Sequence, residues 1–171
     1  MNKLWYKKRS SLHGSGLFAA TNIKNKEQVI QYIGDKVTKK EGDKRADIQL
    51  QKAEKNKKTG MVYVFELNKK YDIDGGVLRN HARFINHSCD PNLIMVPIRI
   101  ETLIPHLALF SLTNIEAGVE LTFDYGNPST AQHVAHNISS EEFLTNKEKE
   151  TLVKCFCGEG TKCKKYLPYH K

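Results

Sequence analysis

The sequence lacks any run of about 18 consecutive apolar residues, the minimum for a membrane-spanning helix, and only 39% of its 171 residues are hydrophobic. We therefore expect no transmembrane segment. The first ten residues, MNKLWYKKRS, have no apolar stretch after their basic side chains, so they do not resemble a secretory signal. A protein that stays where it is made, in the cytoplasm or nucleus, is the expectation, and delivery into a host cell stays open.

Internal repeats and low-complexity tracts are also absent, and the length suits one domain rather than two. Acidic residues are too few to balance the basic ones, and the net charge is +8. Between Lys36 and Lys58 there are nine Lys and Arg against four Asp and Glu. This basic flank has two open interpretations: it contacts nucleic acid, or it is a solvated helix without a partner.

Short apolar and β-branched segments separated by turn residues predict a mainly β protein. Polar stretches with capping-box spacing predict two peripheral helices. One is an exposed helix from Thr38, with Glu41 three residues later, to about Lys58, and the other runs from Ser139 to about Val153. A loop is expected over 127–137. The expected strands cover 17–20, 27–33, 61–67, 71–74, 93–104, 107–112 and 120–125.

Cysteine is scarce, yet three of the four cysteines crowd together as Cys155, Cys157 and Cys163. Without a secretion signal, such crowding favours a metal site over disulfides. A tetrahedral zinc ion needs a fourth ligand, and the remaining cysteine is Cys89. If Cys89 completes the site, zinc fastens the C-terminal tail to the middle of the chain. The alternative is a tail of free thiols beside a buried Cys89.

Two long motifs accompany these cysteines. RFINHSCDPN at 83–92 contains Cys89, and ELTFDYG at 120–126 lies between Cys89 and the cysteine tail. Both resemble signatures of the SET-domain protein lysine methyltransferases. HGSGL at 13–17 is similar to the glycine loop of that family, YIG at 32–34 to its YxG segment, and the cysteine tail to its post-SET zinc motif, whose fourth ligand is the cysteine of NHSC. The resemblance runs from about Leu12 to Cys163.

This resemblance implies a fold of several small curved sheets with a threaded C-terminal segment. It divides the chain into a SET domain at 1–130 with a helical insert at about 38–58, a linker and helix at 131–154, and a post-SET zinc tail at 155–171. Two positions depart from the family pattern. Five residues, rather than four, separate Cys157 from Cys163, and Ser15 stands where the family often has a bulky aromatic residue.

The activity that the resemblance implies is methyl transfer from S-adenosylmethionine to the side-chain amine of a protein lysine. Such chemistry mainly requires an amine aligned with the methyl group, so positioning is the main catalytic device. The implied catalytic residues are Tyr125, Tyr63 and Phe123. The implied cofactor-binding residues are His13, Gly14, Ser15, Tyr63, Arg83, Asn86, His87, Tyr125 and Phe156, and the implied zinc ligands are Cys89, Cys155, Cys157 and Cys163.

The implied substrate is a histone tail or another basic, nucleic-acid-associated protein, which would place the enzyme at chromatin. Phe123, two residues before Tyr125, predicts dimethyl or trimethyl product. A rival hypothesis is a non-catalytic zinc-containing SET-like module that binds basic peptides or nucleic acid. Other polar residues receive no functional role: Asp72 and Asp74 are expected to brace the fold, and His106, His133 and His136 to lie at the surface, while Trp5 is expected to be a packing residue.

Overall fold

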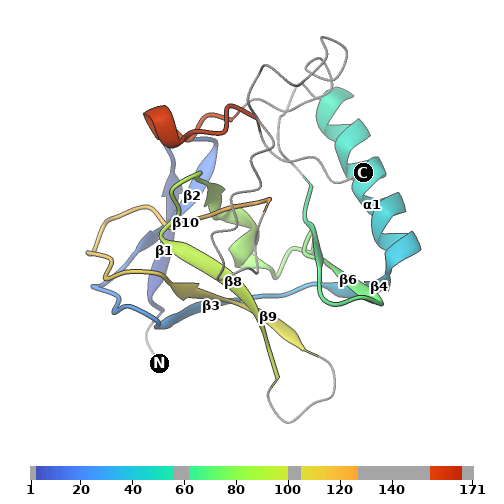
Figure 1. Ribbon diagram of the computed structural model, residues 1–171, viewed down its shortest axis with the longest axis horizontal. Helices are drawn as coiled ribbons and strands as arrows, with labels where there is room; N and C mark the ends of the chain where they lie inside the picture. The colour runs from blue at the N-terminus through green and yellow to red at the C-terminus, as the bar shows by residue number, and fades with distance from the viewer. Residues whose placement is uncertain (1–2, 56–61, 100–104, 127–154, 167–171) are drawn as a thin grey trace.

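The computed structural model describes residues 3–55, 62–99, 105–126 and 155–166 (Figure 1). Within these ranges the chain is mainly β, as predicted. The strands are β1 (Trp5–Arg9), β2 (Ser15–Ala19), β3 (Gln28–Tyr32), β4 (Asp35–Thr38), β5 (Val64–Glu66), β6 (Tyr71–Asp74), β7 (Asn86–His87), β8 (Leu93–Ile98), β9 (His106–Ser111) and β10 (Thr122–Phe123). One α-helix, α1 (Lys39–Lys55), and two short 3-10 helices, η1 (His81–Phe84) and η3 (Gly160–Lys162), complete the described part.

The strands form three small sheets, and the largest has the order β3-β9-β8-β10-β7. The short strand β10 lies between β7 and β8 and runs parallel to both. This register places Thr122 beside Asn86 and Phe123 beside His87. Two motifs that are more than 30 residues apart in the sequence therefore meet side by side.

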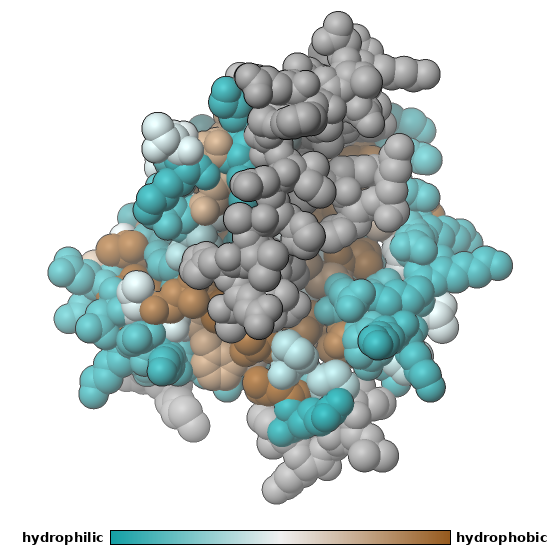
Figure 2. All heavy atoms as spheres, viewed as in Figure 1, coloured by the Kyte–Doolittle hydropathy of each residue, from teal (hydrophilic) through white to brown (hydrophobic). Residues whose placement is uncertain are grey.

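The core lies beneath this sheet, where alternate residues of the strands point inward. Leu93 and Met95 of β8 and Leu107 and Leu109 of β9 are almost completely buried. Leu17 of β2 joins the same apolar cluster. Figure 2 shows brown apolar residues in the middle of one face with teal hydrophilic residues on both flanks.

The sheet β4-β6-β5 carries α1 on the flank opposite β1 (Figure 1). The predicted N-cap of this helix is confirmed, since Thr38 Oγ1 accepts a hydrogen bond from Glu41 N at 3.4 Å. The helix is attached by ion pairs to β6: Lys39 lies 2.6 Å from Asp72, and Arg45 lies 3.1 Å from Asp74. Both carboxylates are buried, so their predicted role in bracing the fold is confirmed.

Several predicted elements differ from the observed ones. β1 and β4 were not predicted, and Trp5 lies in β1, where its ring is 5.1 Å from that of His81. The predicted strand at 120–125 shortens to the two residues of β10. His106 is exposed, as expected.

The predicted loop and second helix, with His133 and His136, lie outside the described residues. None of the described helices has the length and apolar character that a membrane span requires.

Candidate active site and metal centre

Asn86 connects the three segments that the sequence motifs singled out. Its side-chain amide donates to the carbonyl oxygens of His13, at 3.1 Å, and Ser15, at 3.4 Å, and it lies 2.8 Å from Glu120 Oε1. Glu120 Oε2 accepts a further hydrogen bond from Ser10. One buried amide therefore holds the glycine loop against the start of the ELTFDYG segment.

Gly14 and Gly16 of this loop are required for different reasons, the first for its backbone conformation and the second for its close approach to a side chain. Gly14 has a φ of +53°, a left-handed conformation that favours glycine, and open space lies where a Cβ would point. At Gly16 a Cβ would lie 2.3 Å from Glu120 Oε1, so a larger residue would displace that carboxylate. The loop can thus bend and approach Glu120 closely, while Gly14 leaves room above it for a ligand.

Tyr125 stands at the edge of an aromatic cluster built from three distant segments of the chain. Its ring centroid lies 4.9 Å from that of Phe123 and 6.5 Å from that of Phe65, which in turn lies 5.2 Å from Tyr32. The Tyr125 hydroxyl donates to the carbonyl oxygen of Ile85 at 2.8 Å. Burial raises the pKa of Tyr125, and neighbouring Tyr63 and Glu120 raise it further. The hydroxyl therefore stays protonated and can donate a hydrogen bond.

Tyr63 lies within electrostatic range of both Arg83 and Tyr125. Burial raises the pKa of Tyr63, and the positive charge of Arg83 opposes that shift. The Tyr63 carbonyl accepts hydrogen bonds from the Tyr32 hydroxyl at 2.9 Å and from Gly75 N at 2.8 Å. Within the described residues, Arg83 Nε is buried and has no hydrogen-bond partner. Arg83 Nη1 donates to the Gly76 carbonyl at 3.3 Å, and the Nε donor without a partner among the described residues suits an acceptor group of a bound ligand.

His87 links Tyr125 to the cysteine tail through both of its ring nitrogens. Tyr125 N donates to Nδ1 at 3.2 Å, so the ring proton of the neutral form is on Nε2, which faces Cys89 Sγ at 3.2 Å. Burial lowers the pKa of His87 to about 4, so the ring is neutral at physiological pH. Its side chain supports its neighbours, and both ring nitrogens are already engaged.

The four cysteines converge on one point. The sulfur atoms of Cys89, Cys155, Cys157 and Cys163 all lie within 4.8 Å of one another, and those of Cys89 and Cys155 are 3.8 Å apart. A zinc ion bound at Zn–S distances of about 2.3 Å separates its tetrahedral sulfurs by about 3.8 Å. The extra residue between Cys157 and Cys163 is accommodated around Gly158 and Gly160, which both have positive φ. The donor set therefore fits a zinc site with four thiolate ligands.

Backbone and side-chain contacts fix the tail around this cluster. Lys164 N lies 3.3 Å from Cys89 Sγ, the type of outer contact that stabilises a thiolate ligand. Ser88 donates to Glu159 at 2.9 Å, and Lys164 Nζ lies 2.6 Å from Asp124, the residue before Tyr125. The tail is thus anchored to both motifs at once.

The structure gathers most of the residues that the resemblance assigned to the site. The glycine loop accepts hydrogen bonds from Asn86, and Tyr63 lies within electrostatic range of Arg83 and Tyr125. Phe156 differs, because its side chain is 56% exposed beside the cysteine cluster. Sequence reasoning missed Phe65, Tyr32 and Glu120 as site residues. The YIG and ELTFDYG motifs contained two of them, but no spacing pattern revealed which side chains would meet.

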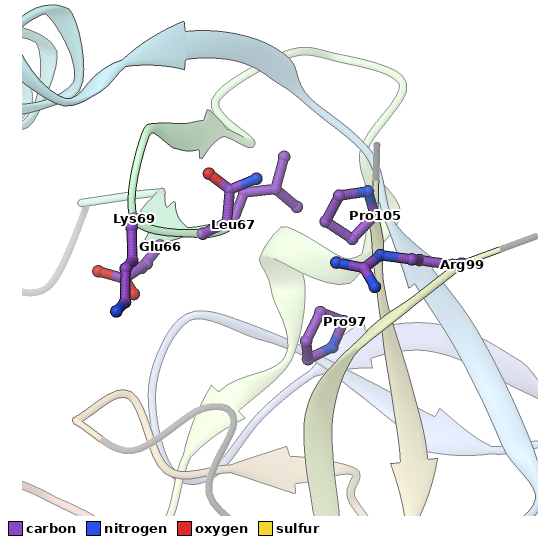
Figure 3. Close-up of a pocket in the computed structure, with 7 residues that line it drawn as sticks. Glu66, Leu67, Lys69, Pro97, Arg99 and Pro105 are labelled. Atoms are coloured by element: carbon purple, nitrogen blue, oxygen red, sulfur yellow. The ribbon is translucent and has the colours of Figure 1, made fainter. Parts of the chain in front are cut away.

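A separate pocket of about 460 Å³ lies between the turn after β5 and the ends of β8 and β9 (Figure 3). Glu66 and Lys69 lie on one side, and Arg99 lies between Pro97 and Pro105 on the other. None of the predicted site residues lines it. The geometry of the motifs, rather than this pocket, identifies the candidate active site.

A comparison with protein families agrees with this geometry. The family model described as SET domain matches residues 14–126, about two thirds of the chain. The chain belongs to the SET domain family. The match begins within the glycine loop, at Gly14, and ends just after Tyr125, so it includes Asn86, Glu120 and the aromatic cluster but not His13.

Curated relatives match a larger share of the chain than the family model does. Histone-lysine N-methyltransferase SUV39H2 of Xenopus tropicalis is 32% identical over 160 residues, covering 90% of this chain and 36% of that protein. Its human counterpart is 33% identical over 165 residues, covering 92% and 37%. Histone-lysine N-methyltransferase Su(var)3-9 of Drosophila melanogaster is 36% identical over 163 residues, covering 90% and 23%. This SET domain chain therefore spans little more than a third, or less, of each of these relatives.

Proposed function

We propose that this SET domain chain transfers methyl groups from S-adenosylmethionine to the side-chain amine of lysine in a protein substrate. The observation that carries the proposal is the position of Tyr125. Its protonated hydroxyl lies within an aromatic cluster and directly beside the segment that Asn86 ties to the glycine loop. The same SET domain relatives carry the name histone-lysine N-methyltransferase.

The residues around the glycine loop fit the cofactor. S-adenosylmethionine, when bound, supplies an electrophilic methyl group on a sulfonium. The backbone of His13, Gly14 and Ser15 would hold it from one side, with Asn86 fixing the loop. Arg83 Nε, the buried donor without a partner among the described residues, would bind its carboxylate. Phe156 is exposed and would be covered on binding.

Tyr125 and its neighbours would position the lysine amine. The aromatic walls of Phe65, Phe123 and Tyr32 exclude water, which favours the neutral amine because desolvation lowers a lysine pKa. The Tyr125 hydroxyl would orient that amine and stabilise the polarised methyl group. Tyr63 would close the pocket that holds the cofactor or the lysine amine, within range of the charge of Arg83. In this scheme positioning and electrostatics supply the rate enhancement.

Zinc is proposed as the structural metal of the tail, held by Cys89, Cys155, Cys157 and Cys163. Four thiolates with no open position are typical of structural rather than catalytic zinc. The ion would fix Cys89 and, through the contact of Cys89 with His87, support the backbone of Tyr125.

Phe123 bears on how many methyl groups are added. A tyrosine at this position would hold a water molecule in the space that a methylated amine needs for another transfer. Phe123 offers no hydroxyl for that water. The residue is only 2% exposed to solvent, and its ring packs against that of Tyr125. We therefore propose dimethyl or trimethyl lysine as the product.

The proposed substrate is a histone or another basic, nucleic-acid-associated protein, and the proposed location is chromatin. The names of the relatives support histone as the first substrate to test. The sheet that carries Phe65 is also mildly acidic around Glu66, Asp72 and Asp74, although Lys39 and Arg45 neutralise part of that charge.

Replacing Tyr125 with phenylalanine tests the proposed catalytic role. The change removes one hydroxyl and its hydrogen bond to Ile85, at a stability cost of about 1 kcal/mol. We expect methyl transfer to recombinant histones to fall at least 100-fold while cofactor affinity, measured by calorimetry, changes little. Tyr71→Phe is the matched control, because Tyr71 lies in β6, its ring centroid is 4.7 Å from the Lys36 ammonium, and it is not among the rings that contact Tyr125 in the described residues. Equal turnover in both variants would remove Tyr125 from the mechanism.

The same assay separates the enzyme from a non-catalytic binding module. An enzyme incorporates labelled methyl groups into mixed basic proteins, and mass spectrometry then identifies the modified lysines. Tight binding of basic peptides without any incorporation, by protein that retains zinc and binds the cofactor, would favour the binding module.

A further inference from the structure

The first 26 residues carry six Lys and Arg and no acidic residue, and the first carboxylate of the chain is Glu27. This stretch forms β1, β2 and the loop that follows β2. Three of the six cations are consecutive in β1: Lys7, Lys8 and Arg9. All three are exposed. The stretch therefore combines an excess of positive charge with the glycine loop of the candidate site, and the three cations of β1 lie on the strand that pairs with the start of β2 beside that loop.

Strand β1 presents these cations on both of its faces. In the described residues it pairs with β2 alone, so its other edge is open. Lys7 Nζ lies 3.7 Å from the centroid of the Phe84 ring on one face, and Lys8 Nζ lies 3.9 Å from that of Phe18 on the other. Aromatic rings hold an ammonium group in place without neutralising its charge. The positive charge of β1 thus remains available to a partner.

Neighbouring carboxylates do not neutralise this surface. Glu120 faces β2, but its two oxygens already accept hydrogen bonds from Ser10 and Asn86. Glu27 accepts a hydrogen bond from the backbone of Lys24, and Glu116 lies in the exposed turn that contacts the end of β2. Within the described residues, no cation of β1 forms an ion pair.

Helix α1, the centre of the basic flank noted in the sequence, is a weaker candidate. Its inward-facing cations, Lys39 and Arg45, are paired with carboxylates of β5, β6 and the helix itself. On its outer face Asp43 and Asp47 follow Lys40 and Lys44 at a spacing of three residues, which places opposite charges side by side. Figure 1 shows α1 and β1 on opposite flanks of the molecule.

We infer that β1 is a contact surface for the phosphodiester backbone of duplex nucleic acid. Cations on both faces of one open strand suit a groove, where the phosphates of the two backbones flank the inserted element. A flat anionic membrane would engage cations on one face only. Tyr6, the exposed aromatic residue of β1, packs its ring against Phe18 at 5.9 Å and so makes a poor stacking platform for single-stranded bases.

The test removes charge from β1 and compares it with an equal change on α1. In Lys7→Gln/Lys8→Gln/Arg9→Gln each side chain keeps two methylene groups and a polar end, while its charge is removed together with the cation–π contacts to Phe84 and Phe18. The control, Lys40→Gln/Lys44→Gln/Lys55→Gln, removes the same three charges from the exposed face of the opposite flank. Circular dichroism melts verify that both variants of the full chain are folded.

Binding is measured by fluorescence anisotropy with a labelled 20-base-pair DNA duplex at several salt concentrations. Each phosphate contact contributes about one unit to the slope of log affinity against log salt. We expect the β1 variant to lose about three units of slope and at least tenfold in affinity at about 100 mM salt, and the α1 variant to bind as the parent does. A parallel RNA duplex shows whether the surface distinguishes the two backbones.

Equal losses in both variants would overturn the inference, because net charge alone would then explain binding. So would failure of the parent chain to bind either duplex, or a preference for anionic phosphatidylserine vesicles over both. None of these readouts depends on methyl transfer, so the proposed activity can fail while the surface stands.

Discussion

Replacing Gln49 with alanine should loosen the attachment of α1 to the candidate active site. The Gln49 side chain donates to Asp74 at 2.9 Å and accepts from the backbone N–H of Tyr63 at 2.8 Å. Asp74 also accepts hydrogen bonds from Arg45 and from the backbone of Gly76. One amide therefore joins the helix to strand β6 and to the backbone of Tyr63.

The expected cost follows from these two hydrogen bonds. A hydrogen bond to a charged partner contributes roughly 1.5–3 kcal/mol, and a neutral one about 1 kcal/mol. Gln49 is only half-buried, so water replaces part of the loss. We therefore expect the free energy of unfolding to fall by about 2 kcal/mol, or the melting temperature by about 4–8 °C.

Urea unfolding followed by circular dichroism measures this change, with Gln51→Ala as the matched control. Gln51 lies on the exposed side of the same helix, and alanine has the higher helix propensity, so the control should be neutral or slightly stabilising. Gln49→Ala should also weaken S-adenosylmethionine binding, because the backbone of Tyr63 loses its anchor. If the two variants unfold within about 0.5 kcal/mol of each other, Gln49 does not have this role.

Two further predictions concern the metal and the product. Purified protein should contain one zinc ion by metal analysis, and chelation should raise hydrogen exchange over residues 155–166 while β8 and β9 stay protected, since structural zinc supplies roughly 10 kcal/mol of local folding free energy. Zinc-free protein with a protected tail would contradict this. Phe123→Tyr should shift the product towards monomethyl lysine without slowing the first transfer, and only monomethyl product from the parent enzyme at long reaction times would refute the reasoning.

The strands that sequence patterns predicted are those with a buried face. β3, β8 and β9 carry alternating or continuous apolar residues. The bounds of β3 and β9 lie within one residue of the predicted ones, whereas β8 ends at Ile98 and the predicted strand continued to residue 104, partly outside the described residues. β1 has four exposed residues out of five, so it shows no hydrophobic period, and its strand conformation depends on pairing with β2. β4 has a single buried residue and was missed for the same reason.

The site divides along a similar line. The motifs identified Asn86, Tyr125 and the four cysteines, because the chemistry of each residue type could be inferred from a short segment. Contacts between residues far apart in the sequence could not be inferred in this way. Gln49 meets Tyr63 only because α1 folds back onto β6, and Phe65 meets Tyr125 only because two different sheets pack together. Such contacts depend on tertiary packing, which no local pattern in one sequence encodes.

The cysteine tail and the candidate catalytic tyrosine behave as one unit because His87 touches both. With Nδ1 accepting from Tyr125 N and Nε2 facing Cys89 Sγ, rotation of the ring would break both contacts at once. Lys164 adds a second connection, since its ammonium pairs with Asp124 while its backbone N–H contacts Cys89. A change in the positions of the four sulfur atoms would therefore reach Asp124 through Lys164 and the backbone N–H of Tyr125 through His87. In this chain the tail is accordingly part of the support for Tyr125.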